Sequence, residues 1–123
     1  MKKYLALLAL LPTLAMAEYA GEISAKDALK KINDREITAI DVRSPEEFAQ
    51  GHIPGAINIP HNALDKHQET LAKLRGKPIL LYCRSGRRAG MAEAQLAESG
   101  FNQVYHLTGD MLGWQEQKLP EAQ

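Results

Sequence analysis

One segment of this chain places its single cysteine between an apolar run and a stretch of helix-forming residues: Pro78-Ile79-Leu80-Leu81-Tyr82-Cys83-Arg84-Ser85-Gly86-Arg87-Arg88-Ala89-Gly90. The apolar run before Cys83 is short and is entered through a Gly-Lys-Pro turn, which is typical of a buried strand. Residues 89–99 are rich in helix formers and end at Gly100, a common residue just past a helix C-terminus. Cys83 is therefore predicted at the carboxyl end of a strand, followed by a tight loop and the start of a helix. In open α/β sheets, ligands bind at this edge.

This position favours a reactive thiolate at Cys83. Successive backbone N–H groups of a tight loop bind anions, and the N-terminus of a helix adds unpaired donors and the positive end of its dipole. Arg84, Arg87 and Arg88 add three cations close to the sulfur. Such groups favour ionised cysteine and also suit the oxyanion of a substrate. We therefore interpret Cys83 as a nucleophile in an anion pocket. The alternative is a small buried hydrophobe, the commoner role of a lone cysteine.

Strands and helices are predicted to alternate along the rest of the chain. Ser24 is expected to cap the first helix, and Ser44, Pro45 and Glu47 form a capping box at the start of the second. The expected helices cover residues 22–32, 44–50, 62–74, 89–99 and 110–117. The expected strands cover residues 37–43, 57–59, 78–82 and 103–107. This alternation predicts an α/β fold, a small parallel β-sheet flanked by helices on both faces and joined by right-handed connections.

The first residues have the pattern of an export signal. The chain starts with Met1-Lys2-Lys3, continues with an apolar run over 4–11, and reaches Ala15-Met16-Ala17, an A-x-A cleavage pattern. The apolar run is shorter than the ~20 residues that a spanning helix needs. We expect residues 1–17 to be a signal peptide, residues 18–123 to form a single domain, and the mature protein to be periplasmic.

The composition excludes several classes of function. The chain has 15 basic and 15 acidic side chains and a formal net charge of zero. Loss of Lys2 and Lys3 with the signal peptide would make this charge −2, so we expect no nucleic-acid partner and no stable insertion into a membrane. A single cysteine allows no internal disulfide, and the four histidines are scattered without the spacing of a metal site.

Three motifs, in order along the chain, are similar to those of a known family. They are residues 41–48 continued by 51–60, residues 82–89, and Leu107-Thr108-Gly109 followed by Trp114. Together they resemble the rhodanese (thiosulfate sulfurtransferase) family, in particular its single-domain, exported members. The family often has two glycines after the last strand, whereas Asp110 follows Gly109 here.

The resemblance implies a rhodanese-like fold and sulfur transfer by double displacement. Cys83 would take sulfur from thiosulfate or a related donor as a persulfide, and cyanide, a small thiol or a thiol protein would then accept that sulfur. No metal or organic cofactor is implied. The residues expected to bind the donor and stabilise the sulfur anion are those of the loop: Arg84, Ser85, Gly86, Arg87 and Arg88.

Asp41 and Arg43 end another predicted strand, so they should share the sheet edge with Cys83. They either support the active-site loop or one of its arginines, or they cap the following turn, with Arg43 paired to Glu47 at the surface. His106 ends the last strand near the same edge and is a weaker candidate for contact with a substrate. Trp114 is interpreted as a packing residue.

Two other functions remain as alternatives. A cysteine phosphatase uses the same strand–Cys–loop–helix order, but its loop closes with an arginine after five intervening residues, whereas Arg88 follows Cys83 after four. A non-catalytic or carrier module would bind persulfide sulfur or deliver it to a protein partner. The carrier shares the first half of the sulfurtransferase reaction, so the sequence does not separate the two.

Overall fold

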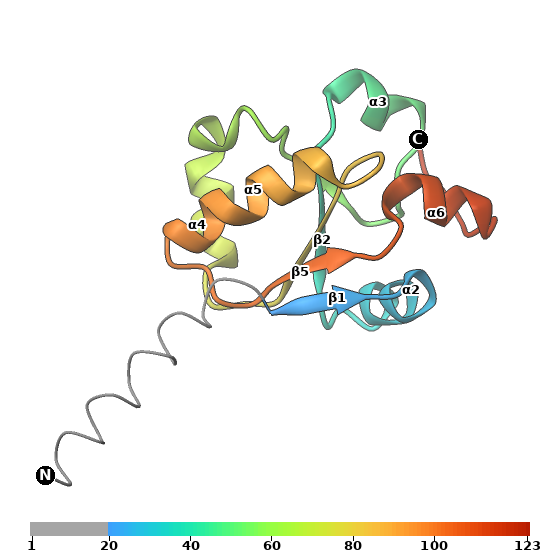
Figure 1. Ribbon diagram of the computed structural model, residues 1–123, viewed down its shortest axis with the longest axis horizontal. Coiled ribbons are helices and arrows are strands. Elements are labelled where there is room, and N and C mark those ends of the chain that lie inside the picture. Colours follow the sequence, from blue (N-terminus) through green and yellow to red (C-terminus); the bar gives the residue numbers. More distant parts are fainter. Residues whose placement is uncertain (1–19) are drawn as a thin grey trace, which may run out of the picture.

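Five parallel strands form the sheet of this protein (Figure 1). The computed structural model describes residues 20–123, so the signal peptide predicted over residues 1–17 lies outside the described residues. The order across the sheet is β1-β5-β4-β2-β3, and every neighbouring pair is parallel. The strands are β1 (Gly21–Ile23), β2 (Thr38–Asp41), β3 (Ile57–Asn58), β4 (Ile79–Tyr82) and β5 (Val104–Leu107). Their carboxyl ends therefore lie at one edge of the sheet.

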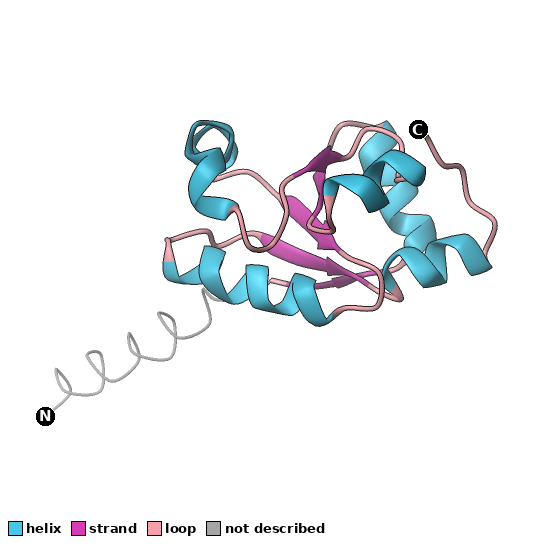
Figure 2. Cartoon of the chain, turned by 90° about the horizontal axis from the view of Figure 1, so that it is seen from above, coloured by secondary structure: helices cyan, strands magenta, loops and turns pink. Residues whose placement is uncertain are grey.

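Helices cover both faces of the sheet (Figure 2). They are α2 (Ala25–Asn33), α3 (Pro45–Gln50), the 3₁₀ helix η2 (Leu64–His67), α4 (Gln68–Leu74), α5 (Arg87–Glu98) and α6 (Asp110–Glu116). One buried cluster joins side chains of η2, α4 and α5 to the sheet, and a second joins those of α2 and α6. The α/β fold with helices on both faces, predicted from the sequence, is confirmed. No helix within residues 20–123 combines the length and apolarity needed to cross a membrane.

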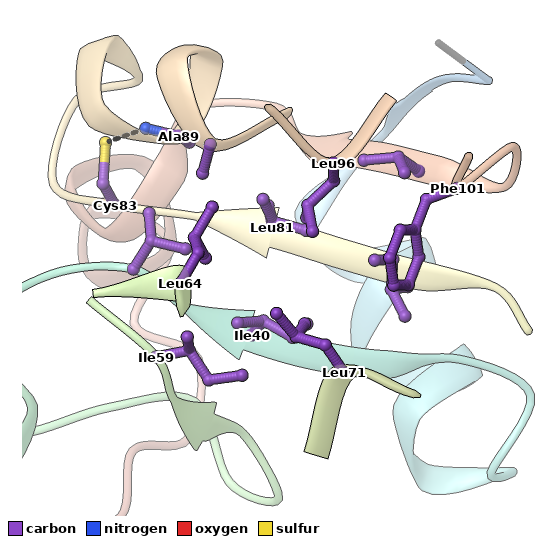
Figure 3. Close-up of a cluster of buried hydrophobic side chains, with 13 residues drawn as sticks. Ile40, Ile59, Leu64, Leu71, Leu81, Cys83, Ala89, Leu96 and Phe101 are labelled. Atoms are coloured by element: carbon purple, nitrogen blue, oxygen red, sulfur yellow. Dashed lines mark hydrogen bonds between the residues drawn. The ribbon is translucent and has the colours of Figure 1, made fainter. Parts of the chain in front are cut away.

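The central strand β4 explains where the cysteine side chain points. All four of its residues are fully buried, as expected for a strand covered on both faces of a parallel sheet. Because side chains alternate along a strand, Ile79 and Leu81 pack on the α5 side while Leu80 and Tyr82 pack on the α2–α6 side. Cys83 continues the alternation and lies with Leu81 in the cluster under α5 (Figure 3).

The capping residues in the sequence predict most helix starts correctly. The Ser44 side chain accepts from the Glu47 N–H while the Glu47 side chain returns to the Ser44 backbone, which is the predicted capping box. Ser24 caps α2 as predicted. The helix after Cys83 starts earlier than predicted, at Arg87 with Gly86 as N-cap, and the helix predicted over 62–74 is divided into η2 and α4.

The sequence did not predict β1. Residues Gly21–Ile23 form a strand, whereas the sequence predicts Glu22 and Ile23 at the start of the first helix. The three residues pair in register with Tyr105, His106 and Leu107 of β5. This strand exists because of a distant partner, so it has almost no local signal.

The last residues of the chain are also bound to the domain. An antiparallel bridge joins His52 to Ala122 through N–H···O distances of 2.9 and 2.8 Å. In Figure 1 the C-terminus accordingly lies next to the end of α3.

Candidate active site

The Cys83 sulfur lies between the carboxyl end of β4 and the N-terminus of α5. It accepts a hydrogen bond from the backbone N–H of Gly86 at 3.0 Å. It also accepts one from that of Ala89 at 3.4 Å (Figure 3). The whole residue is 1% exposed. Backbone donors and the positive end of a helix dipole both stabilise a negative sulfur. This site therefore suits a thiolate or a persulfide anion better than a neutral thiol.

Gly86 makes this turn feasible. Its φ is +116°, a backbone conformation that side chains disfavour. A Cβ at this position would also lie 3.1 Å from Asp110 Oδ2 and 3.7 Å from His106 Nε2. The turn that directs an N–H at the sulfur is therefore packed closely against the residues that follow β5.

The three loop arginines have different environments. Arg84 and Arg87 are exposed, and neither makes an ion pair within the described residues 20–123. Arg88 is half-buried, and its Nη1 and Nη2 donate to Glu47 at 2.6 and 3.1 Å. The hydrogen bond from Arg88 lowers the pKa of Glu47 to about 2, against a smaller effect of burial. Arg84 and Arg87 are thus the arginines available to a donor anion.

Asp41 and Arg43 form a buried ion pair with each other. Arg43 Nη2 lies 2.7 Å from Asp41 Oδ2, and the two side chains are 7% and 0% exposed. Arg43 also donates to the Gly51 carbonyl at 2.7 Å, so the pair holds the turn after α3. Asp41 Oδ1 also accepts the Arg43 N–H at 2.9 Å, which confirms that Asp41 caps the turn after β2. The predicted pairing of Arg43 with Glu47 is wrong, because Glu47 binds Arg88 instead. Glu47 thus helps to support the loop through Arg88, a role that the sequence did not predict for it.

Asp110 occupies the position where a second glycine was expected. It adopts φ +53°, a left-handed conformation that aspartate tolerates better than most residues. Its buried carboxylate accepts the Cys83 N–H at 3.0 Å. The next two N–H groups, of Met111 and Leu112, donate to the carbonyls of Cys83 and Arg84. The first turn of α6 is therefore hydrogen-bonded directly to the active-site loop.

His106 and Trp114 make different kinds of contact. His106 lies beside the loop, but Glu93 and Asp110 engage both of its ring nitrogens. Trp114 is fully buried and donates to the Pro120 carbonyl, which confirms its role in packing. Glu93 carried no sequence signal, because its proximity to His106 depends on how α5 packs on β5.

The comparison with known families agrees with this geometry. A family model described as "Rhodanese-like domain" matches residues 24–117. The chain belongs to the rhodanese-like family. Within this rhodanese-like domain, the matched segment includes Cys83, the loop that donates to its sulfur, and Asp110.

Individual relatives indicate the range of proteins that carry this domain. The chain is 33% identical over 101 residues to a sulfurtransferase of Allochromatium vinosum, covering 81% of this chain and 92% of the relative. It is 30% identical over 117 residues to a tRNA uridine(34) hydroxylase of Enterobacter, covering 89% of this chain but only 34% of that protein. A rhodanese-related protein of Thermoplasma volcanium has a similar structure, with a TM-score of 0.69, 30% identity, and coverage of 84% of this chain and 98% of the other. The domain and the sulfurtransferase relative support a sulfur-transfer role for this site.

Proposed function

We propose that this protein is a thiosulfate sulfurtransferase that carries sulfur as a persulfide on Cys83. The observation that carries the proposal is the Cys83 sulfur itself, which accepts two backbone N–H groups at the N-terminus of α5 within a rhodanese-like domain. The sulfurtransferase relative supports the same class of reaction. The proposed setting is the periplasm, reached through the signal peptide predicted over residues 1–17.

The reaction has two steps. In the first, the Cys83 thiolate attacks the outer sulfur of thiosulfate, an S–S bond forms on Cys83, and the S–S bond of thiosulfate breaks with release of sulfite. In the second, cyanide or a thiolate attacks the outer sulfur of the persulfide and leaves with it as thiocyanate or as a new persulfide, which restores the Cys83 thiolate. Both steps start from a negative sulfur at Cys83 and need no oxidant or reductant.

The residues of the loop have distinct roles in this scheme. The Gly86 and Ala89 N–H groups stabilise the thiolate and the persulfide anion. The exposed Arg84 and Arg87 attract the donor and hold its sulfonate oxygens. Arg88 is already paired with Glu47, so its contribution is to fix the first turn of α5.

Intact-mass spectrometry tests the proposal directly. The reduced protein is exposed briefly to thiosulfate and then to cyanide. We expect a mass gain of one sulfur atom after thiosulfate, its loss after cyanide, and neither change in Cys83→Ser. The absence of any gain in a folded protein would exclude thiosulfate as the donor. Phosphate release from an aryl phosphate, abolished by Cys83→Ser, would instead support the phosphatase alternative.

The choice between a free enzyme and a carrier depends on the acceptor. With the persulfide formed, turnover with cyanide or a small thiol at a steady rate is expected of the sulfurtransferase. A persulfide that resists small thiols but passes to a protein thiol would identify a carrier.

A further inference from the structure

Three ionisable side chains from three elements meet behind the active-site loop. His106 Nε2 lies 3.0 Å from Asp110 Oδ2, and His106 Nδ1 lies 2.5 Å from Glu93 Oε2. His106 comes from β5, Asp110 from the first position of α6 and Glu93 from α5. Their side chains are 14%, 4% and 12% exposed. We refer to His106, Asp110 and Glu93 as the carboxylate–histidine cluster.

The geometry of the cluster defines the protonation state of the ring. Each ring nitrogen faces a carboxylate oxygen, which accepts hydrogen bonds but has none to donate when ionised. With both carboxylates ionised, each nitrogen has to carry a proton to make its hydrogen bond, which makes the ring an imidazolium cation. The hydrogen bonds to Asp110 and Glu93 raise the pKa of His106 to about 10, although burial opposes this.

The cluster is connected to the backbone of the nucleophile. The other oxygen of Asp110, Oδ1, accepts the Cys83 N–H at 3.0 Å. A buried carboxylate is therefore bound to the backbone of the residue whose side chain has to carry a negative charge. A nearby like charge disfavours ionisation of the thiol, so Asp110 alone would oppose the reactive form of Cys83.

We propose that His106 is a positioning residue that neutralises Asp110, which allows Asp110 to hold the Cys83 backbone without disfavouring the thiolate. This inference rests on the proposed function only in taking the thiolate as the reactive form. The three charges of the cluster sum to −1 with the imidazolium present and would sum to −2 without it.

Other charged groups around His106 do not replace this role. Glu22 of β1 lies opposite His106 in register, but its carboxylate accepts from Thr108 Oγ1 and adds negative charge. The neighbour on β4 is the apolar Leu81. The active-site loop brings the exposed Arg84 and Arg87, whereas Arg88 is paired with Glu47. Among these surroundings, the imidazolium is the cation in hydrogen-bond contact with Asp110.

The test is the pH dependence of Cys83 alkylation by iodoacetamide, which needs no sulfur donor. Cys83 is the single cysteine, so the signal belongs to it alone. Four proteins are compared: the wild type, His106→Gln, Asp110→Asn and the double variant. His67→Gln is the matched control, because His67 Nδ1 also makes a hydrogen bond, with the Ala63 carbonyl, but the residue lies in η2.

The proposal predicts a specific pattern of midpoints. His106→Gln should raise the pH midpoint of alkylation by about one unit, because it leaves two carboxylates uncompensated. Adding Asp110→Asn should return the midpoint towards that of the wild type. Asp110→Asn alone should lower the midpoint, because the cluster then keeps the imidazolium but loses one of its two negative charges. His67→Gln should leave the midpoint unchanged.

Two results would overturn the proposal. One is an unshifted midpoint in folded His106→Gln; the other is a double variant whose midpoint is raised as much as in the single variant. If His106→Gln does not fold, ¹⁵N NMR of the His106 ring in the wild type at pH 8 decides instead. Two protonated nitrogens support the proposal, and a neutral ring contradicts it. Because alkylation is independent of thiosulfate, these outcomes remain distinct from failure of the proposed function.

Discussion

Glu47 and Arg88, 41 positions apart in the chain, are joined by two hydrogen bonds, the shorter of which is 2.6 Å. The same Glu47 completes the capping box of α3. One carboxylate therefore fixes the start of α3 and the start of α5, the helix whose N-terminus lies at Cys83. The pair connects the segment after β2 to the segment after β4 at the active edge of the sheet.

Glu47→Gln should remove the ion pair with Arg88 but keep the capping box, because glutamine at this position can still cap α3. We expect a free energy of unfolding lower by about 0.5–1 kcal/mol near neutral pH. The pKa of Glu47 is lowered to about 2 in the folded state, so the contribution is present above about pH 4.5 and is lost as the pH falls towards 2. Urea unfolding at several pH values measures the difference, which should shrink in acid. Glu46→Gln, at the exposed neighbouring position, should change little.

Gly86→Ala should damage the turn at the nucleophile. The substitution places a side chain at φ +116° and a Cβ 3.1 Å from Asp110 Oδ2, so we expect a loss of about 1–3 kcal/mol in stability and slower alkylation of Cys83. Gly90→Ala is the matched control, because Gly90 is inside α5 and nothing lies within 4 Å of its added Cβ. That variant should be as stable as the wild type or more stable by about 0.5–1 kcal/mol. Equal stability of the two variants would contradict the role given to Gly86.

Asp41→Asn should be strongly destabilising. It leaves the buried Arg43 guanidinium without its counter-ion, at a cost of about 3–5 kcal/mol. Asp34→Asn removes a comparably short ion pair with Lys30, at 2.7 Å, but in exposed side chains, and should change the stability little. Thermal or urea unfolding of both variants compares the two environments. A small effect at Asp41 would show that Arg43 finds water or another acceptor.

His106 should make the stability of the protein depend on pH in the alkaline range. Its folded-state pKa is raised from 6.5 to about 10, so the stabilisation is fully present below about pH 6.5 and is lost as the pH rises through 10. A pKa change of this size corresponds to a loss of up to about 5 kcal/mol once the ring is deprotonated in both states. Urea midpoints measured from neutral pH to above pH 10 should fall in the wild type and stay flatter in His106→Gln. Parallel curves for the two proteins would be inconsistent with an imidazolium in the cluster.

The sequence predicted what depends on neighbours along the chain. The capping box at Ser44 and Glu47 involves positions three apart, and the buried strand before Cys83 is marked by its own apolar residues. The parallel α/β fold followed from the alternation of such elements. The position of Cys83 at a strand end next to a helix start followed for the same reason, although α5 starts at Arg87 rather than at Ala89.

The sequence did not predict what depends on distant partners. β1 is a strand because Gly21–Ile23 pairs with β5, and Glu47 supports the active-site loop because two helix starts meet in space. Asp110 was visible as a departure from the family pattern. Its hydrogen bond to the Cys83 N–H, 27 positions away in the chain, was not visible in the sequence.

The bridge between His52 and Ala122 means that the folded domain is longer than its family signature. The family match ends at residue 117, yet the buried Trp114 indole donates to the Pro120 carbonyl and His52 pairs with Ala122 beyond that point. Cutting the chain after Gln117 would leave a buried indole N–H without an acceptor and would remove the bridge to His52 from the turn after α3. For transplanting this domain into a fusion protein, the junction therefore has to lie beyond Ala122.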